Sequence, residues 1–190
     1  MRILSIILLS LLAFACRHDT KPSAPQQPAP GEWFWSYSQG MKAPTKDGDW
    51  WTFDWNPSGE ADMLLKNIMP NLTTNNVIEA TWRCGDCQVR PTEGSIPSAK
   101  VSLILIGIDF NSERLFWAGQ PISNGGGEIR VPLDPKLWGS IYGKELEPDR
   151  FSHLISSVRQ VGFCFGSPDD GATCHGARGT GKMSFTYAIK

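Results

Sequence analysis

Apolar and polar residues alternate along most of the chain from Glu32 onward. Aromatic residues alternate with other residues in 32–37 and again in 49–55, and 76–83 has the same period of two. Successive side chains of a β-strand point to opposite faces of a sheet, so this period is typical of strands. Gly, Pro, Asn and Asp separate the runs, as is usual for turns. The pattern therefore predicts a series of short strands.

We expect about eight strands in the folded part of the chain. They are 32–37, 49–55, 76–83, 100–110, 114–118, 128–133, 158–165 and 182–189. This number favours an all-β fold, a jelly-roll-like antiparallel β-sandwich. Within it, 101–108 is apolar at odd and even positions alike, which indicates a central strand that is covered on both faces. Two short helices are expected as connectors, at 60–69 and at 151–157.

The first 16 residues have the composition of a cleaved export signal. Arg2 is followed by an apolar run too short for a permanent membrane span, and small residues precede Cys16. Residues 12–16 resemble a bacterial lipobox, which implies that Cys16 carries lipid and begins the mature protein. The alternative is ordinary secretion, with Cys16 discarded. Arg17 stands where an aspartate would signal inner-membrane retention, so we expect a bacterial envelope protein anchored in the outer membrane through its lipid.

Composition divides the rest of the chain into a tether and one domain. Residues 17–31 are rich in proline and polar residues and are expected to form a disordered tether. Residues 32–190 form the predicted β-sandwich domain, because a chain of 190 residues with 41% hydrophobic residues can bury one sizeable core. The formal net charge of −1 comes without a basic stripe, so nucleic acid is not an expected partner.

Four cysteines remain after Cys16, and we interpret them as two disulfides. They are Cys84, Cys87, Cys164 and Cys174, and the sequence alone does not give their pairing. A bridge from Cys164 to Cys174 would close the loop between them, and one from Cys84 to Cys87 would close a tight turn. The alternatives are a zinc site that includes His175 and a redox C-x-x-C. The single C-x-x-C argues against zinc, and the absence of a strand-to-helix setting argues against redox chemistry.

The aromatic run 49–55 has two interpretations. Strand parity places Trp51, Phe53 and Trp55 on one face and Trp50 on the other. In the first interpretation the former set packs in the core and Trp50 covers an edge. In the second, one or two exposed indoles stack against a sugar ring, for which the flat apolar face and the N–H of tryptophan are suited. The candidates are Trp33, Trp35, Trp50, Trp51 and Trp55.

Polar groups that would fix the orientation of sugar hydroxyls lie on two of the expected strands. Trp82 shares the parity of apolar neighbours and is assigned to the core, so Glu79, Thr81 and Arg83 face the other way. Arg130 is flanked by apolar residues of opposite parity. We name Glu79, Arg83 and Arg130 as candidate ligand-binding residues. A solvated sheet face would show the same pattern.

The sequence offers no catalytic group that we can assemble into a site. Its three histidines come without a G-x-S-x-G elbow or an H-E-x-x-H helix. His175 follows Cys174 directly, and adjacent side chains on extended backbone point apart. A jelly-roll polysaccharide lyase or hydrolase is therefore the least favoured class, because acid–base catalysis needs positioned groups.

No cofactor is expected, with a structural calcium ion as the alternative. Carboxylates are paired at Asp47 and Asp49 and at Asp169 and Asp170, and loop oxygens of this kind can bind Ca²⁺. Aspartate is equally expected in turns for capping the backbone, and no metal ligand is assigned.

Three segments of the C-terminal third carry a family pattern. In 154–166 a strand of the form V-x-x-V-G-F-x-F-G is followed by Cys174-His-Gly176 and by a last strand in 180–189. These segments resemble the closing strands of galactose-binding-like jelly rolls and of non-catalytic carbohydrate-binding modules, and 76–83 is similar to an earlier strand of those modules. The resemblance covers about half of the folded region and implies the fold. The two cysteine pairs depart from the pattern, and no sugar-site motif matches, so no binding residue is carried over.

Two functional hypotheses follow. The first is a non-catalytic carbohydrate-binding envelope lipoprotein that stacks a glycan or cell-wall polysaccharide on exposed tryptophans. The second is a structural or assembly lipoprotein that binds another envelope protein through a sheet face or edge.

Overall fold

The structure is a computed structural model that describes residues 28–69, 71–92, 99–107, 114–122, 125–140, 146–166 and 174–190. The expected signal peptide, Cys16, residues 17–27 of the tether, and the pair Asp169 and Asp170 lie outside these residues. Residues 28–31 are described, and the Pro28 carbonyl accepts a hydrogen bond of 2.9 Å from the side-chain amide of Asn67. None of the helices in the described part of the chain combines the length and the apolar character needed to cross a membrane.

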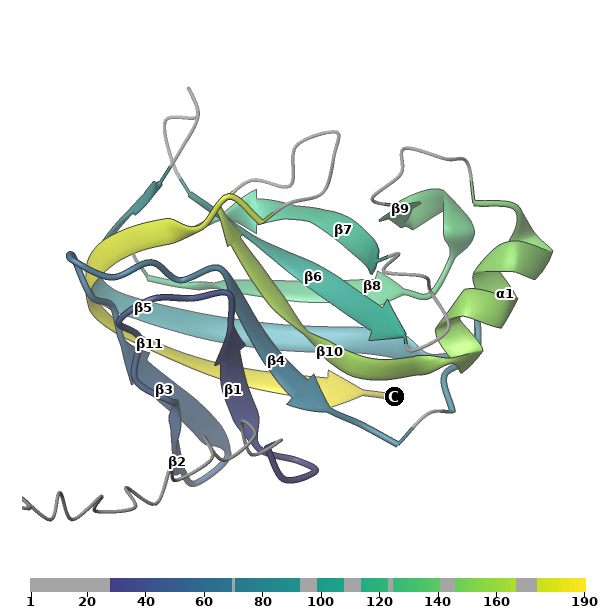
Figure 1. Cartoon of the computed structure of the whole chain (residues 1–190), viewed down its shortest axis with the longest axis horizontal. Coiled ribbons are helices and arrows are strands. Elements are labelled where there is room, and N and C mark those ends of the chain that lie inside the picture. Colours follow the sequence, from purple (N-terminus) through teal and green to yellow (C-terminus); the bar gives the residue numbers. More distant parts are fainter. Residues whose placement is uncertain are drawn as a thin grey trace, which may run out of the picture.

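Within the described residues the chain forms two antiparallel sheets that stack face to face (Figure 1). The six-stranded sheet has the order β1-β4-β10-β6-β7-β9, with the bounds β1 (Trp33–Ser36), β4 (Met63–Asn67), β10 (Val158–Gly166), β6 (Lys100–Gly107), β7 (Arg114–Pro121) and β9 (Gly139–Ser140). The five-stranded sheet has the order β2-β3-β11-β5-β8, with the bounds β2 (Thr45–Asp47), β3 (Trp50–Asp54), β11 (Ala177–Ile189), β5 (Val77–Pro91) and β8 (Gly127–Pro132). The predicted all-β sandwich is confirmed.

Two helical segments connect strands. The short 3-10 helix η1 spans Pro135–Leu137, and α1 spans Pro148–Ser156 and lies at one end of the sandwich (Figure 1). The helix expected at 151–157 is therefore present. Its apolar positions Phe151, Leu154 and Ile155 are buried in the core, which explains why a nine-residue helix holds its place.

The helix expected at 60–69 is wrong. Residues 63–67 form β4, which pairs with β1 on one side and with β10 on the other. Met63, Leu64 and Leu65 are all buried, so successive side chains are covered on both faces of the sheet. Such a run looks alike in a buried helix and in a central strand, and here the neighbouring strands decide the outcome. The prediction that 101–108 is a central strand is confirmed by β6, which lies between β10 and β7.

The long pair β5 and β11 runs through the middle of the five-stranded sheet. It continues past the expected ends of both strands, from Ile78 opposite Ile189 to Pro91 opposite Ala177. The register shifts by one residue where Gly85 to Gln88 of β5 face Lys182 to Thr180 of β11. A β-bulge of this kind leaves one residue extra on one strand.

Two disulfides use the four described cysteines. Cys84 bonds to Cys87 across the bulge of β5, and Cys164 at the end of β10 bonds to Cys174. The extra residue in the bulge, where Asp86 has φ 54°, lets Cys84 and Cys87 both face inward although they are three positions apart. The expected pairs are thus confirmed. Since each sulfur is bonded to another, the zinc and Cys174–His175 interpretations lose their thiolates.

Aromatic side chains from both sheets fill the core. The ring of Trp33 in β1 lies 5.7 Å from Phe163 in β10 and 5.0 Å, edge to face, from Phe185 in β11. Phe163 and Phe185 themselves lie 5.1 Å apart across the two sheets. Edge-to-face and offset contacts at these distances are favourable beyond the area they bury. The assignment of Trp82 to the core is confirmed, because its side chain is 1% exposed.

Trp33→Ala should lower the free energy of unfolding by about 3–5 kcal/mol, the usual cost of truncating a large core aromatic. Guanidinium unfolding followed by circular dichroism measures this change. Trp50→Ala, on the outer side of the other sheet, serves as the matched control and should cost less than about 1 kcal/mol. A loss for Trp33→Ala no larger than that of the control would contradict the packing described here.

Candidate functional site

Four of the candidate residues lie on the outer face of the five-stranded sheet, namely Trp50, Glu79, Arg83 and Arg130. Thr52 of β3, Ser184 of β11 and Arg83 of β5 lie side by side in register, and the hydroxyls of Thr52 and Ser184 are 2.9 Å apart. The next residues along these strands, Phe53, Met183 and Cys84, point into the core instead. Period-two alternation thus separates a polar outer face from an apolar inner face, as the sequence predicts.

Trp50 and Arg83 are in direct contact on this face. The guanidinium carbon of Arg83 lies 4.1 Å from the centroid of the Trp50 ring. A cation over an indole is stabilised by the ring quadrupole, by about 0.5–1 kcal/mol at an exposed site. Trp50 is half-buried and Arg83 is exposed, and the guanidinium lies over one face of the indole.

Glu79, Arg130 and Lys190 form a second group further along the same face. Glu79 of β5 is opposite Arg130 of β8, and their side chains approach to 3.4 Å between Oε1 and Nε. The ammonium of Lys190 contacts the other carboxylate oxygen of Glu79. The hydrogen bond from Lys190, together with the positive charges of Lys190 and Arg130, holds the pKa of Glu79 below its usual value. Exposed pairs of this kind contribute little stability, so they mainly orient the charged groups.

The structure excludes two of the candidate tryptophans as surface platforms. Trp33 is 4% exposed and Trp55 is 5% exposed, so naming them as stacking residues is wrong. Trp33 packs against Phe163 of its own sheet and Phe185 of the facing sheet. Trp55 packs edge to face on Phe165, with 5.3 Å between centroids. Neither indole can present its face to a sugar.

Trp35 and Trp51 are half-buried and pack against the core with part of each ring at the surface. The indole N–H of Trp35 donates to the carbonyl of Lys42 at 2.8 Å, and the ring lies edge to face on Phe53. The ammonium of Lys46 lies 6.0 Å from the centroid of the Trp51 ring. Both rings mainly serve packing, which leaves Trp50 as the candidate indole on the polar face.

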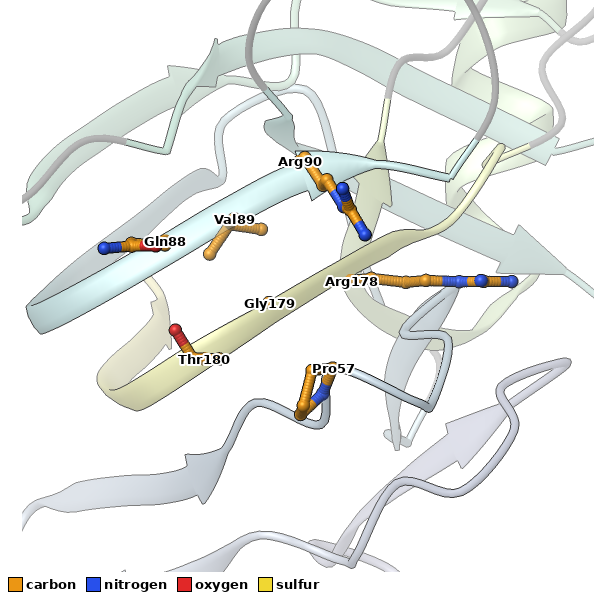
Figure 2. A pocket seen from close by; sticks show the side chains of 7 residues that line it. All are labelled: Pro57, Gln88, Val89, Arg90, Arg178, Gly179 and Thr180. Carbon is orange, nitrogen blue, oxygen red and sulfur yellow. The ribbon is translucent and has the colours of Figure 1, made fainter.

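A cavity of about 320 Å³ lies beyond the bulge of β5 (Figure 2). Figure 2 shows that three of its lining residues come from β5, three from β11, and one from the segment that follows β3. They are Gln88, Val89 and Arg90, then Arg178, Gly179 and Thr180, and finally Pro57. The guanidinium of Arg178 faces Glu60, with 3.5 Å between Nη2 and Oε2. Sequence reasoning missed this cavity, because its two arginines are 88 positions apart and only the register of β5 and β11 brings them together.

A smaller pocket of about 200 Å³ lies beside the six-stranded sheet and is lined by Tyr37, Asp62, Met63, Arg114 and Cys174. Tyr37 is 71% exposed, has φ 58°, and lies with its ring 5.4 Å from the guanidinium carbon of Arg114. Burial, and to a smaller extent the charge of Glu60, raise the pKa of Asp62 to about 7, although the charge of Arg114 opposes the rise. Oδ1 of Asp62 is buried and has no hydrogen-bond partner. The sequence signal nearest to this pocket is the aromatic run that ends at Tyr37.

No group of three or more His, Cys, Asp or Glu side chains among the described residues is arranged to hold a metal ion. Asp47 lies exposed in β2 at the sheet edge, and Asp49 lies in the turn that follows.

Comparisons with known proteins identify neither a family nor a ligand for this chain. No family model matches the chain, and a search of curated proteins finds no match. Among solved structures, a protein described as "xylan-binding module CBM15" is similar with a TM-score of 0.37 and 13% sequence identity, over 83% of this chain and 90% of that chain. We base no argument on a likeness of this level.

The raised pKa of Asp62 predicts a pH dependence of stability. The folded state retains a proton at Asp62 up to about pH 7, whereas the ordinary pKa of this carboxyl in the unfolded chain is 3.8, so the folded state loses stability as the pH rises between these values. Relative to Asp62→Asn, the wild type should lose roughly 1–2 kcal/mol of unfolding free energy from pH 4 to 8, a figure reduced for partial exposure. Denaturant titrations at several pH values measure it. Asp47→Asn, an exposed carboxyl, is the control, and parallel curves for wild type and Asp62→Asn would refute the effect.

Proposed function

We propose that this protein is a non-catalytic glycan-binding lipoprotein of the bacterial envelope. It binds a polysaccharide on the outer face of the five-stranded sheet, with Trp50 as the stacking residue. The observation that carries the proposal is the Trp50–Arg83 contact at 4.1 Å on a face that also presents hydroxyl groups. Binding of this kind needs no acid–base group, and the proposal assigns none.

The chemistry of this face suits a sugar ring. An indole offers a flat apolar surface to the C–H face of a pyranose, while guanidinium and hydroxyl groups bond its oxygens. Arg83 supplies several donors beside the ring, and Thr52 and Ser184 supply hydroxyls that donate or accept. Thr81 and Thr186 lie opposite each other two residues further along β5 and β11. A sugar that stacks on Trp50 takes the ring face opposite Arg83 or displaces the guanidinium, which then stays within reach of the sugar hydroxyls.

The envelope part of the proposal comes from the N-terminal sequence. Lipid on Cys16 would anchor the protein in the outer membrane, and the proline-rich tether would hold the sandwich away from the lipid surface. An extended proline-rich chain spans about 3.1 Å per residue, so residues 17–27 would reach on the order of 30 Å. This distance leaves a sheet face free to meet a polymer outside the anchor.

Trp50→Ala should weaken polysaccharide binding at least tenfold, because it removes the stacking surface. Affinity electrophoresis in gels that contain soluble glycans, followed by calorimetry on any glycan that retards the wild type, measures the change. Tyr37→Ala is the matched control, since it removes an exposed aromatic ring beside the other sheet.

The outcomes separate the competing hypotheses. A glycan whose binding survives Trp50→Ala but not Tyr37→Ala would move the site to the Tyr37 pocket. Failure of the wild type to bind any glycan of a broad panel would overturn the proposal. An envelope protein that co-purifies with both the wild type and Trp50→Ala would instead favour the structural or assembly hypothesis.

A further inference from the structure

Two arginines from neighbouring strands line the cavity beyond the bulge (Figure 2). Arg90 of β5 and Arg178 of β11 are direct cross-strand partners, and Gln88 and Thr180 form the next pair on the same face. Like charges directly opposite on neighbouring strands repel each other. The register therefore places two positively charged residues on neighbouring strands at one cavity, and a bound anion would relieve their repulsion.

The protein neutralises this charge only in part. Arg178 forms an ion pair with Glu60, in which Nη2 and Oε2 are 3.5 Å apart. This distance is longer than the 2.7–2.9 Å or so of a strong charge-assisted hydrogen bond. The Nε of Arg178 is buried and has no hydrogen-bond partner. Arg90 is exposed and forms no ion pair with any described residue. Glu60 pairs with Arg178 alone, and the positive charge of Arg90 remains as a surplus at the cavity.

The size of the cavity and its other lining residues indicate which chemical class of anion it can bind. The volume of about 320 Å³ lies at the small end of the usual range for ligand pockets, roughly 300–1,000 Å³, and suits a single sugar residue. The Thr180 hydroxyl and the Gln88 amide can bond hydroxyl groups, while Pro57 offers apolar contact. A guanidinium matches a planar carboxylate through two parallel hydrogen bonds. A uronic acid residue combines these features, namely a carboxylate, several hydroxyls and an apolar ring face.

We infer that the Arg90–Arg178 cavity binds the carboxylate of a uronic acid residue, so that the glycan recognised by this protein is an acidic polysaccharide. The inference rests on the proposed glycan-binding function and names its ligand class. The cavity and the Trp50–Arg83 surface lie on the same outer face of β5, seven positions apart from Arg83 to Arg90. At about 3.3 Å per residue this separation is roughly 20 Å, so one extended polymer could reach both.

The test compares uronate polymers with their own neutral forms. Polygalacturonate and alginate are the probes, each beside its carboxyl-reduced derivative, with binding measured by calorimetry on the full folded protein. The wild type should bind at least one uronate polymer about tenfold or more tighter than the reduced form, and Arg90→Gln should remove about tenfold of that preference. Arg90→Lys should restore only part of it, because an ammonium lacks the planar fork of donors.

Lys136→Gln is the matched control, since it removes one positive charge from an exposed position in η1. It should leave the uronate preference unchanged, whereas a non-specific charge effect would lower the preference equally in both variants and would overturn the inference. Dextran sulfate is a further competitor. Displacement by dextran sulfate without any uronate preference would show that the cavity selects a sulfate ester, and the carboxylate assignment would be wrong.

The experiments distinguish an error in the uronic acid inference from an error in the proposed glycan-binding function. If the wild type binds the native and the reduced polymers equally, and Arg90→Gln changes neither affinity, the acidic-ligand inference is overturned while glycan binding stands. If no polymer binds in either form and the wider glycan panel is also negative, the proposed function is overturned as well.

Discussion

The fold depends on aromatic contact across the gap between the two sheets. Trp33 and Phe163 of the six-stranded sheet meet Phe185 of the five-stranded sheet, with ring centroids 5.0 and 5.1 Å apart in the two cross-sheet pairs. Phe53 and Phe165 extend the same contact at 6.0 Å. Large rings in edge-to-face contact fix both the spacing and the relative position of the sheets, because interiors are packed as closely as crystals. Because the core fixes the position of each sheet, it also fixes the positions of the polar residues on the outer faces.

The same alternation that builds the interior also builds the candidate site. On β5, Trp82 and Cys84 point inward while Arg83 between them points outward to Trp50. The rigid, doubly paired strand therefore holds the cationic group in place, and a site on a strand is more precisely positioned than one on a loop. Packing, register and surface chemistry are three consequences of one pattern.

Features that depend on the local period of two could be predicted from the sequence. Features that depend on which strands lie side by side could not. The sandwich and the outward orientation of Glu79 and Arg83 follow from a period of two. Parity could not tell which face of β1 is inward, so Trp33 remained a surface candidate until its partners from β10 and β11 were placed. For the same reason β4 resembled a helix, since an apolar run has no period of its own. The opposition of Arg90 and Arg178 depends on a long-range register that no local pattern encodes.

The bulge at 85–88 sets which way the end of β5 faces. Because Asp86 is an additional residue, odd and even positions exchange their roles there, and Gln88 and Arg90 project outward while Val89 packs against the core. A regular strand with the same amino acids and no bulge would instead turn Asp86 and the Arg90 guanidinium inward. The Cys84–Cys87 disulfide spans the bulge, so a covalent bond stabilises the change of alternation that turns Gln88 and Arg90 outward.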